Sequence, residues 1–542
     1  MQLYKTDKKE FSDKEILSII RDYENTEVGR MDKLWSYYQG KNTAILSRKI
    51  ASDSFTSSVK KDDSFNESRV SSNKNTPDNS VPVPYGRKII TTFTGYAFRP
   101  KYITYKPIEL RQELEFELHK YSSDLKVGEI VEDESKIPVE LQTKIENNRK
   151  FYVELMKNNR LNNEHIKTAR AGRNLGIFGV SYELLYVDGV LDNKLNVKAE
   201  VKYITVDPRE MILFYNYDSS PKKVAAIRFY PVASNKYFVE VYYSDKIVKY
   251  VRERNEDSGW TLTVDSTHTN YFGEIPVVAF YAGDEMLGLI EPVIPLIDAY
   301  DVLISDSMNE FDRFAHAYLV LKRMSLVDPL KKKEPGAFSA ALANLKRFRV
   351  FENLDKDADV KFLTKDIPHE YIQFMTTLVQ RQIHTQSHVP DFAGEKFTGA
   401  SGIAIQRLLF DFENVCSDIE ADFDVALYER MRLIATIYDK LGRAHGDFST
   451  INISHKRNSP LNLEEYAKTA TLMKQAGFSS YLIADMMPDD VVPDVEEEIT
   501  RQKREKEDMF SDVESVEEDE EVDEEEPEEP TEAEKPKRNV YE

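Results

Sequence analysis

The chain has 542 residues, of which 41% are hydrophobic, and it carries a formal net charge of −22 at neutral pH. This length is above that at which a single hydrophobic core stops growing, so we expect two or more structural units. The only cysteine, Cys416, excludes an intramolecular disulfide and a zinc site built on several thiolates. No stretch approaches eighteen uncharged apolar residues and no apolar segment follows the N-terminal lysines, so we expect neither a membrane span nor a signal peptide.

The negative charge is concentrated near the C-terminus. Residues 511–534 contain fifteen acidic residues and no basic one, and without them the net charge would be −7. This composition cannot form a packed core, so residues 510–542 are predicted to be a disordered acidic tail. The remaining surface is mildly acidic and is not expected to hold DNA tightly, because binding to phosphates depends on lysine and arginine. Such a surface is compatible with a protein past which DNA moves without adhering.

The N-terminal part of the chain shows helical and extended patterns in turn. Apolar residues recur at helical spacing from Asp13 to Gly40, which predicts one helix. Residues 51–80 are rich in Ser, Asp, Asn and Lys and are predicted to be a flexible loop. Residues 88–98 favour a helix, and residues 102–105 favour a strand.

A series of strands is predicted in the middle of the chain. A helical stretch over residues 141–176 is followed by residues 180–187, which alternate apolar and polar side chains as a half-buried strand does. Asp-Pro, Ser-Pro and Asp-Ser-Gly sequences then supply the residue types that short turns require. The segments that predict an antiparallel β region are 201–206, 211–215, 224–230, 237–243, 247–252 and 277–281.

Two predicted helices flank a small mixed module in the second half of the chain. From Asp284 to about residue 315 a broad apolar face predicts a helix, with Pro292 and Pro295 as sources of a kink near its start. A second helix is predicted from His369 to about His384. The module between them contains strand patterns at 318–321, 347–351 and 360–363.

A loop with three glycines leads to the longest predicted helix. Residues 389–402 read VPDFAGEKFTGASG, and Ser401 is a suitable N-cap for a helix from Gly402 to about Leu441. Shorter helices are predicted at 463–476, 479–486 and 495–509. The combination of helices with an antiparallel β region places the chain in the α+β class.

One group of acidic residues has part of a metal-binding pattern. Asp355, Asp357 and Asp359 have the odd spacing of a calcium-binding EF-hand loop. Val360, however, stands where a glycine makes the sharp turn of that loop. A charged surface turn is therefore favoured over a calcium site.

A second group is similar to part of a nuclease pattern. Asp391, Glu395 and Lys396 are the residue types with which metal-dependent nucleases hold a cation and stabilise the charge on phosphate. That pattern needs one residue between its acid and its lysine, and here they are adjacent. A polar loop is the favoured interpretation.

The histidines and the cysteine add no reactive group. His384 and His388 would share a helix face, but no third ligand accompanies them, so structural or exposed histidines are favoured over a metal site. Cys416 lies among apolar neighbours and is expected to be an inert core thiol. The sequence therefore predicts a protein that is not an enzyme and that needs no cofactor or metal.

Several stretches of the chain resemble one protein family. The run GDEMLGLIEPVIPLIDAYDVLISDSMNEFDRF from Gly283, then a mixed module, a second helix and VPDFAGEKFTGASGIAIQ, is similar to the portal proteins of long-tailed phages that infect Gram-positive bacteria. Gln406 departs from the resemblance, because many relatives carry a lysine there, and the loop at 51–80 looks additional. Further similar stretches are 158–188, 206–216 and 451–480.

The resemblance implies a portal fold that assembles as a ring. The parts that it implies are an N-terminal wing region (1–283), a first stem helix (284–315), a small α/β clip (316–366), a second stem helix (367–387), a tunnel loop (388–401), a long wing helix (402–446) and C-terminal wing or crown helices (447–509).

The resemblance also implies a function and partners. Members of the family form a ring, usually of twelve subunits, at one capsid vertex of the virion, through which double-stranded DNA enters during packaging and leaves during ejection. The expected partners are further copies of the chain, the terminase large subunit, a head-tail adaptor, and the major capsid and scaffold proteins. Assembly is expected in the host cytoplasm. The alternative is another non-enzymatic head component, such as a minor head or scaffold-associated protein.

Three groups of residues are predicted to carry this function. Acidic residues on the first stem helix would face the channel and keep DNA from adhering by repulsion. Residues of the tunnel loop would touch passing DNA, and lysines of the clip would meet the terminase motor or an adaptor. These residues are Asp298, Asp301, Asp306, Glu310 and Asp312 in the stem, Asp391, Phe392, Glu395, Lys396 and Phe397 in the loop, and Lys331, Lys332 and Lys333 in the clip.

Overall fold

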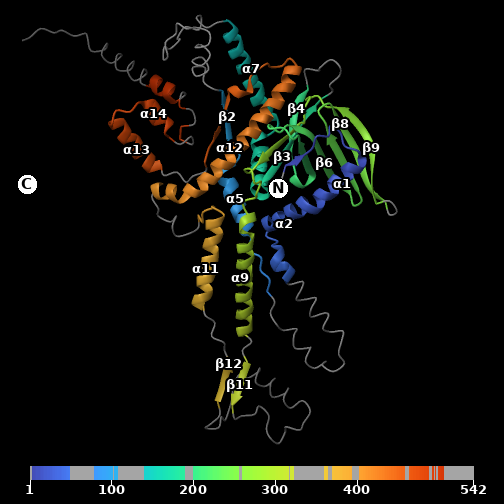
Figure 1. Ribbon diagram of the computed structural model, residues 1–542. Coiled ribbons are helices and arrows are strands. Elements are labelled where there is room, and N and C mark those ends of the chain that lie inside the picture. The colour runs from blue at the N-terminus through green and yellow to red at the C-terminus, as the bar shows by residue number, and fades with distance from the viewer. Residues whose placement is uncertain are drawn as a thin grey trace, which may run out of the picture. The chain divides into compact units, whose positions relative to one another are not determined.

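A computed structural model gives the fold of the chain (Figure 1). Two compact units, Met1–Asn458 and Ser459–Glu542, divide the chain, and each is described by itself. The structure describes residues 3–48, 79–101, 103–107, 139–189, 199–255, 259–315, 318–322, 359–363, 369–392, 402–457, 463–487, 491–492, 495 and 498–505.

Helices at the N-terminus open the first unit. Helix α1 (Asp13–Tyr23) begins after Ser12, whose backbone N–H donates to the Glu15 carboxylate at 2.9 Å and so satisfies one of the free donors of a helix start. A π turn, η1 (Glu24–Val28), joins α1 to α2 (Gly29–Tyr38). The single helix predicted from Asp13 is therefore interrupted by a π turn.

A six-stranded sheet packs against α1 (Figure 1). Ile16, Ile20 and Tyr23 of α1 are buried against alternate residues of the strands, because successive side chains of a strand point to opposite faces. All neighbouring strands are antiparallel except β1 and β5. The strands, in spatial order, are β1 (Tyr4–Lys5), β5 (Met211–Tyr215), β6 (Lys223–Ala233), β7 (Lys236–Tyr242), β8 (Lys246–Asn255) and β9 (Gly259–Thr269).

A second, three-stranded sheet forms part of the main core. Strand β3 (Val180–Asp188) lies between β10 (Val277–Tyr281) and β4 (Glu200–Val206), and both pairings are antiparallel. Its first six residues are buried, including the polar Ser181 and Glu183, so the prediction of a half-buried strand from the alternating pattern is wrong. The helices of this region are α5 (Tyr85–Ala97), α7 (Val139–Leu161) and α8 (Glu164–Phe178), and the 3-10 turn η4 (Pro208–Glu210) precedes β5.

The long helix α12 (Gly402–Lys440) completes this core. The ring of Phe423 lies 4.5 Å from that of Phe280 and 4.9 Å from that of Phe98, measured between centroids, so the helix packs on both β10 and the end of α5. After the 3-10 turn η6 (Phe448–Thr450), strand β13 (Ile451–His455) pairs antiparallel with β2 (Ile103–Pro107). The first unit thus joins segments far apart in the sequence.

Helices α9 (Ile294–Ala315) and α11 (His369–Gln386) lie side by side (Figure 1). The Tyr85 ring contacts Tyr300 near the start of α9, at 5.0 Å, and His384 near the end of α11, at 6.0 Å, so the two helices run antiparallel. The 3-10 turn η5 (Glu291–Val293) precedes α9. Between the helices in sequence, β11 (Tyr318–Lys322) and β12 (Asp359–Leu363) form an antiparallel pair.

The second unit contains short helices. Helix α13 (Leu463–Gln475) is followed by α14 (Ser480–Asp485), which begins after Ser479. The Ser479 hydroxyl accepts a hydrogen bond from the Leu482 backbone N–H at 3.2 Å, as expected of an N-cap. Residues 498–505 are also helical.

The mixed helix and strand content confirms the α+β class, but the prediction that a helix begins at Asp284 is wrong. Met286 has a φ of +53°, and the Leu289 backbone N–H donates to the Gly176 carbonyl at 2.8 Å. The apolar residues of this stretch therefore pack on α8 in an irregular conformation, and α9 begins only at Ile294. The predicted strand at 347–351, the N-cap Ser401, residues 51–78 of the predicted loop and the predicted tail at 510–542 lie outside the described residues.

Candidate functional site

The first turns of α9 bind side chains from the N-terminal part of the chain. The Tyr37 hydroxyl donates to Asp298 Oδ1 at 2.6 Å. The side-chain amide of Asn42 donates to the Asp301 carboxylate, and the Val83 backbone N–H donates to Asp301 Oδ1 at 2.8 Å. Asp301 is fully buried, and this burial raises the pKa of its carboxyl group. The two donors compensate for the lost hydration of the carboxylate.

Residues 79–83, here named the strap, continue along the same face of α9. The Val81 backbone N–H donates to Ser305 Oγ at 3.0 Å. The Asn79 backbone N–H donates to Asn309 Oδ1 at 2.6 Å, and its side-chain amide donates to Asp312 at 2.6 Å. The strap therefore runs antiparallel to α9 and is fixed to it by alternate residues.

The sequence of the strap explains this register. Residues 81–84 read VPVP, and each proline holds the preceding valine in an extended conformation while contributing no N–H of its own. Two extended residues span about 6.6 Å and four helical residues span about 6 Å, so Val83 and Val81 match Asp301 and Ser305. The polar positions of α9 at 301, 305, 309 and 312 form one helix face of matching period.

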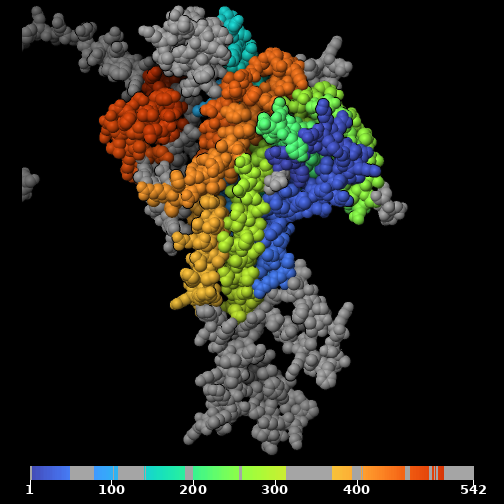
Figure 2. Space-filling view, viewed as in Figure 1, coloured from blue at the N-terminus to red at the C-terminus, as the bar shows by residue number. Residues whose placement is uncertain are grey.

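These contacts change the interpretation of the five acids predicted to face a channel. The prediction for Asp301 is wrong, because its carboxylate is buried and bonded within the chain. Asp298 and Asp312 are half-buried and also hydrogen-bonded within the chain. Asp306 is half-exposed and forms an ion pair with Arg48 at 3.0 Å. Figure 2 shows the blue N-terminal segment beside the yellow-green helix α9. Asp306 and half-buried Glu310 stay predictions for a channel surface.

Large apolar side chains are exposed on both helices of the pair. On α11, Tyr371 and Phe374 are 61% and 60% exposed, and Leu378 lies one turn further along the same face. On α9, Met308 and Phe311 are exposed three residues apart, with Phe311 at 68%. We name these groups the α11 stripe and the α9 stripe. Contiguous exposed apolar side chains of this kind are typical of surfaces that bind another protein.

Asp391 follows α11 and is held by side chains of two helices. Lys88 of α5 places its Nζ 2.8 Å from Asp391 Oδ1. The Gln380 amide donates to Asp391 Oδ2 at 3.4 Å, and His384 Nε2 lies 3.9 Å from the same oxygen. The carboxylate predicted to touch DNA is therefore occupied by contacts within the chain. Phe392 is 39% exposed, and its contact with DNA stays a prediction.

The turn after α11 is fixed by His384. Its Nδ1 lies 2.9 Å from the Val389 carbonyl oxygen, so the ring donates there and leaves Nε2 as an acceptor. Burial lowers the pKa of His384, which keeps the imidazole neutral near neutral pH. His388 adopts a φ of +57° at the turn. These contacts orient the chain from Val389 to Asp391.

The remaining predicted site residues lie outside the described part of the chain. Glu395, Lys396 and Phe397 of the predicted tunnel loop are among them, as are Lys331, Lys332 and Lys333 of the predicted clip. Their roles stay predictions. Of the acids that resemble an EF-hand loop, only Asp359 is described, and it begins strand β12.

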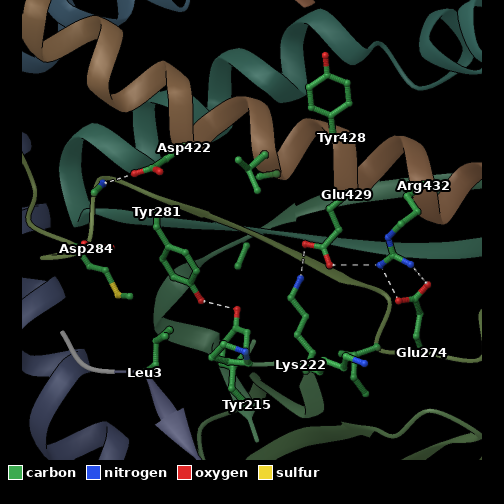
Figure 3. A pocket seen from close by; sticks show the side chains of 18 of the residues that line it. Leu3, Tyr215, Lys222, Glu274, Tyr281, Asp284, Asp422, Tyr428, Glu429 and Arg432 are labelled. Atoms are coloured by element: carbon green, nitrogen blue, oxygen red, sulfur yellow. Dashed lines mark hydrogen bonds and ion pairs between the residues drawn. The ribbon is translucent and has the colours of Figure 1, made fainter. Parts of the chain in front are cut away.

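A hollow of about 900 Å³ opens between the six-stranded sheet, β10 and α12 (Figure 3). Arg432 binds Glu274 through two hydrogen bonds of 2.6 Å, and Lys223 donates to Glu429 at 2.5 Å. The Lys223 ammonium also donates to the Val277 carbonyl at 2.7 Å. These charged groups neutralise one another at the wall, and most of the remaining lining is apolar. The hollow therefore has the character of a packing surface.

A buried ionic cluster links α12 to the core. Arg430 Nη2 lies 2.8 Å from Glu164, and its Nη1 lies 3.2 Å from Glu183. The Tyr105 hydroxyl accepts from Arg430 at 2.7 Å. Burial raises the pKa of Glu183, although the guanidinium opposes this shift. Because removal of one partner would leave a buried charge without compensation, the cluster acts as a structural tie.

The described residues contain no cluster of three or more His, Cys, Asp and Glu side chains that could hold a metal ion. Cys416 is buried, and this burial raises the pKa of its thiol, as the prediction of an inert core thiol requires. None of the described helices is long and apolar enough to cross a membrane.

Sequence reasoning missed the partners of the α9 acids and of Asp391. Tyr37, Asn42 and the strap lie more than 200 residues before α9, and Lys88 lies 303 residues before Asp391. Such pairs leave no trace in local periodicity. The VPVP sequence was the available indication, since two alternating prolines predict an extended segment whose free N–H groups need acceptors.

The fold and the exposed apolar stripes indicate a general class of protein. An α+β body that carries an antiparallel helix pair with exposed apolar stripes fits a protein of an assembly. A family model described as "Phage portal protein, SPP1 Gp6-like" matches residues 17–509. The chain belongs to this family of phage portal proteins.

One curated relative and two solved structures are among the proteins similar to this chain. The portal protein of Bacillus phage SPP1 is 22% identical over 250 residues, which are 44% of this chain and 46% of that protein. The match thus spans less than half of the relative's length. Among solved structures, the neck of a native GTA particle computed with C12 symmetry is similar with 10% identity and a TM-score of 0.38, over 74% of this chain and 89% of that chain. The neck of an empty GTA particle computed with C6 symmetry is similar with 11% identity and a TM-score of 0.33, over 58% and 76%.

Proposed function

We propose that the chain is the subunit of a closed ring at one capsid vertex, which forms the channel for DNA packaging and ejection. The observation that carries this proposal is the family match over residues 17–509. In this proposal α9 and α11 are the stem, β11 and β12 belong to the clip, and residues 388–401 are the tunnel loop. The expected number of subunits is twelve.

The two apolar stripes support assembly into a ring. A ring of identical subunits needs two different surfaces on each copy, one of which binds the other surface on the next copy. The α11 stripe and the α9 stripe are two such surfaces on neighbouring helices. We propose that the α11 stripe of one copy contacts the α9 stripe of the next copy. Burial of these side chains would then contribute to assembly.

Asp306, which forms an ion pair with Arg48, and Glu310 are the acids of α9 that we propose to lower the affinity of the channel for DNA. Asp306 and Glu310 lie on one helix face with exposed Ala299 and Val302, away from the strap. Repeated around a ring, these carboxylates would repel the DNA phosphates at close range. The chain serves in this proposal as a structural and not a catalytic component.

The proposed partners follow from the position at the vertex. They are further copies of the chain, the terminase large subunit, a head-tail adaptor, the major capsid and scaffold proteins, and double-stranded DNA passing without sequence preference. Lys331, Lys332 and Lys333 are proposed to meet the terminase or the adaptor, and Phe392, Glu395, Lys396 and Phe397 are proposed to lie near DNA.

Sedimentation of the purified full chain tests the assembly. The proposal predicts a discrete species with the mass of about twelve subunits, and addition of this species to portal-free capsid assembly reactions should yield particles that package DNA. A chain that stays monomeric across salt and protein concentrations, or rings that never support packaging, would contradict the proposal.

A further inference from the structure

The chain leaves the α9–α11 pair at a point that is fixed by three side chains. Helix α11 ends at Gln386, and five residues later the Asp391 carboxylate contacts Lys88, Gln380 and His384. Gln380 and His384 come from α11 itself, whereas Lys88 comes from α5. The contacts therefore join the end of α11 to a second helix of the first unit.

Helix α5 provides a rigid support for this contact. Ile89, Ile90 and Phe93 of α5 are fully buried in the main core, so the backbone that carries Lys88 is held on its opposite side. Tyr85, one turn earlier, packs edge-on against His384. A displacement of Asp391 would therefore have to break the contact with Lys88, since α5 cannot follow.

His384 connects the position of Asp391 to the turn that precedes it. One ring nitrogen binds the Val389 carbonyl at 2.9 Å, and the other faces Lys88 Nζ at 3.5 Å and Asp391 at 3.9 Å. The Val389 side chain is buried, and its backbone N–H lies 3.4 Å from Ser387 Oγ. The path of residues 387–391 is thus set by contacts on both sides of the backbone.

We propose that Lys88, Gln380 and His384 form an anchor for Asp391 that positions the start of the tunnel loop for the passage of DNA and is not needed for ring assembly. This inference rests on the proposed function. The residues are positioning residues, because they act through the place at which residue 392 begins and do not themselves contact DNA.

The accessibility of the anchor explains why assembly and DNA passage are separable. The Lys88 side chain is 41% exposed and that of Asp391 is 25% exposed, and ion pairs so close to solvent contribute little to the stability of a fold. Neither residue belongs to the α9 stripe or the α11 stripe. Loss of the pair should therefore leave the ring intact while the start of the loop gains freedom.

Charge reversals test the anchor in full-length rings. Lys88→Asp and Asp391→Lys are each expected to form rings in wild-type yield and to lower the amount of nuclease-protected linear double-stranded DNA in packaging reactions at least five-fold. The double variant Lys88→Asp with Asp391→Lys restores an ion pair of opposite direction, and it should recover most of the packaging. Recovery in the double variant would show that the two positions act as a pair.

Two further variants keep the test decisive. Lys150→Asp makes the same charge change in an exposed ion pair with Glu146 on α7, and it should leave packaging unchanged. Asp391→Asn removes the charge while keeping the side-chain shape, and it should lower packaging in the same direction as the reversals. If a charge reversal reduces the yield of rings, packaging by the Asp391→Asn variant is compared with that of the wild type instead.

The outcomes separate the anchor from the proposed function. Wild-type rings that package DNA, together with anchor variants that package equally well, would overturn the anchor alone, as would a double variant no better than the single ones. Anchor variants that all fail to form rings would overturn the separation from assembly. Wild-type chains that form no ring, or rings that package nothing, would instead overturn the proposed function.

Discussion

Two buried charged side chains, Asp301 and Arg430, connect segments of the chain that are distant in sequence. Asp301 accepts hydrogen bonds from Asn42 and Val83, and Arg430 binds Glu164 and Glu183. Each of these groups is buried, so its hydrogen bonds replace water that burial has removed. At both positions, the partners come from segments distant in the sequence, and one side chain thereby connects several elements.

Replacement of Asp301 by alanine should loosen the strap. The change leaves the partly buried Val83 N–H without this acceptor and leaves the Asn42 amide with only the Val83 carbonyl, and an unsatisfied buried group costs about 1–3 kcal/mol. Hydrogen exchange followed by mass spectrometry should show faster exchange of the Val83 amide, with little change in β6 or β7. Asp301→Asn keeps one acceptor oxygen and serves as the control with a smaller effect. Unchanged exchange at Val83 in the alanine variant would contradict the strap contact.

His384 should make stability depend on pH in a defined direction. Burial lowers the pKa of His384 below its ordinary value of about 6.5, so on acidification the unfolded chain takes up this proton before the folded chain does. Stability from this group is therefore present above pH 6.5 and is lost as the pH falls towards the lowered pKa. The fall in thermal midpoint between pH 7.5 and pH 5.5 should be smaller in His384→Gln than in the wild type. An equal or larger fall in the variant would contradict this assignment.

The spacing of apolar residues predicted most helices and strands, but it did not predict which groups their polar side chains contact. The helices at 369–384 and 402–441 and most strands between residues 180 and 281 agree with the structure, because each has an apolar face that packs on a core. Strand β9 was not predicted, although Asp257-Ser258-Gly259 before it was interpreted as a turn of the β region. β9 is an edge strand and none of its residues is fully buried, so its sequence lacks a clear alternation of apolar and polar residues.

For α9, the helix was predicted correctly apart from its start, but the role predicted for one of its acidic residues, Asp301, is wrong. The sequence indicates a helix with an apolar face and acidic residues elsewhere, and repulsion of DNA is then a reasonable role for all of the acids. The structure divides them, because Asp301 is buried and receives a donor from the strap, whereas Asp306 is half-exposed and forms an ion pair with Arg48. Only a long-range contact distinguishes the two, and a single sequence contains no record of it. The candidate site could therefore be predicted only as far as its helices.

The α11 stripe should be required for contacts between subunits and not for the stability of a single subunit. Phe374 is 60% exposed in a single chain, so Phe374→Asp should change the stability of the monomer by no more than about 0.5 kcal/mol, as is usual for surface substitutions. In a ring, the same change would bury a charge without a partner and should shift the population to monomers at micromolar concentration. Mass photometry measures this shift. Val264→Asp on β9, where the valine is equally exposed at 60%, is the matched control and should still form rings.

The whole molecule combines a packed core with surfaces that a single copy leaves open. The first unit joins segments as distant as β2 and β13 into one core and ties α12 to it through Arg430. The family match covers residues 17–509 and so includes residues of both units. The apolar side chains of the α9 stripe and the α11 stripe, by contrast, are exposed in a single chain. In the proposed ring of identical subunits, each stripe would have a partner, and Asp306 and Glu310 would lie around a channel.

The proposed function requires that copies of this chain close into a ring around a channel. Electron microscopy of the purified full-length protein, viewed down the symmetry axis, tests this claim most directly. We expect a closed ring of twelve subunits with an open centre bordered by the α9–α11 pairs. Particles without a central channel, open filaments, or single chains under all assembly conditions would contradict it.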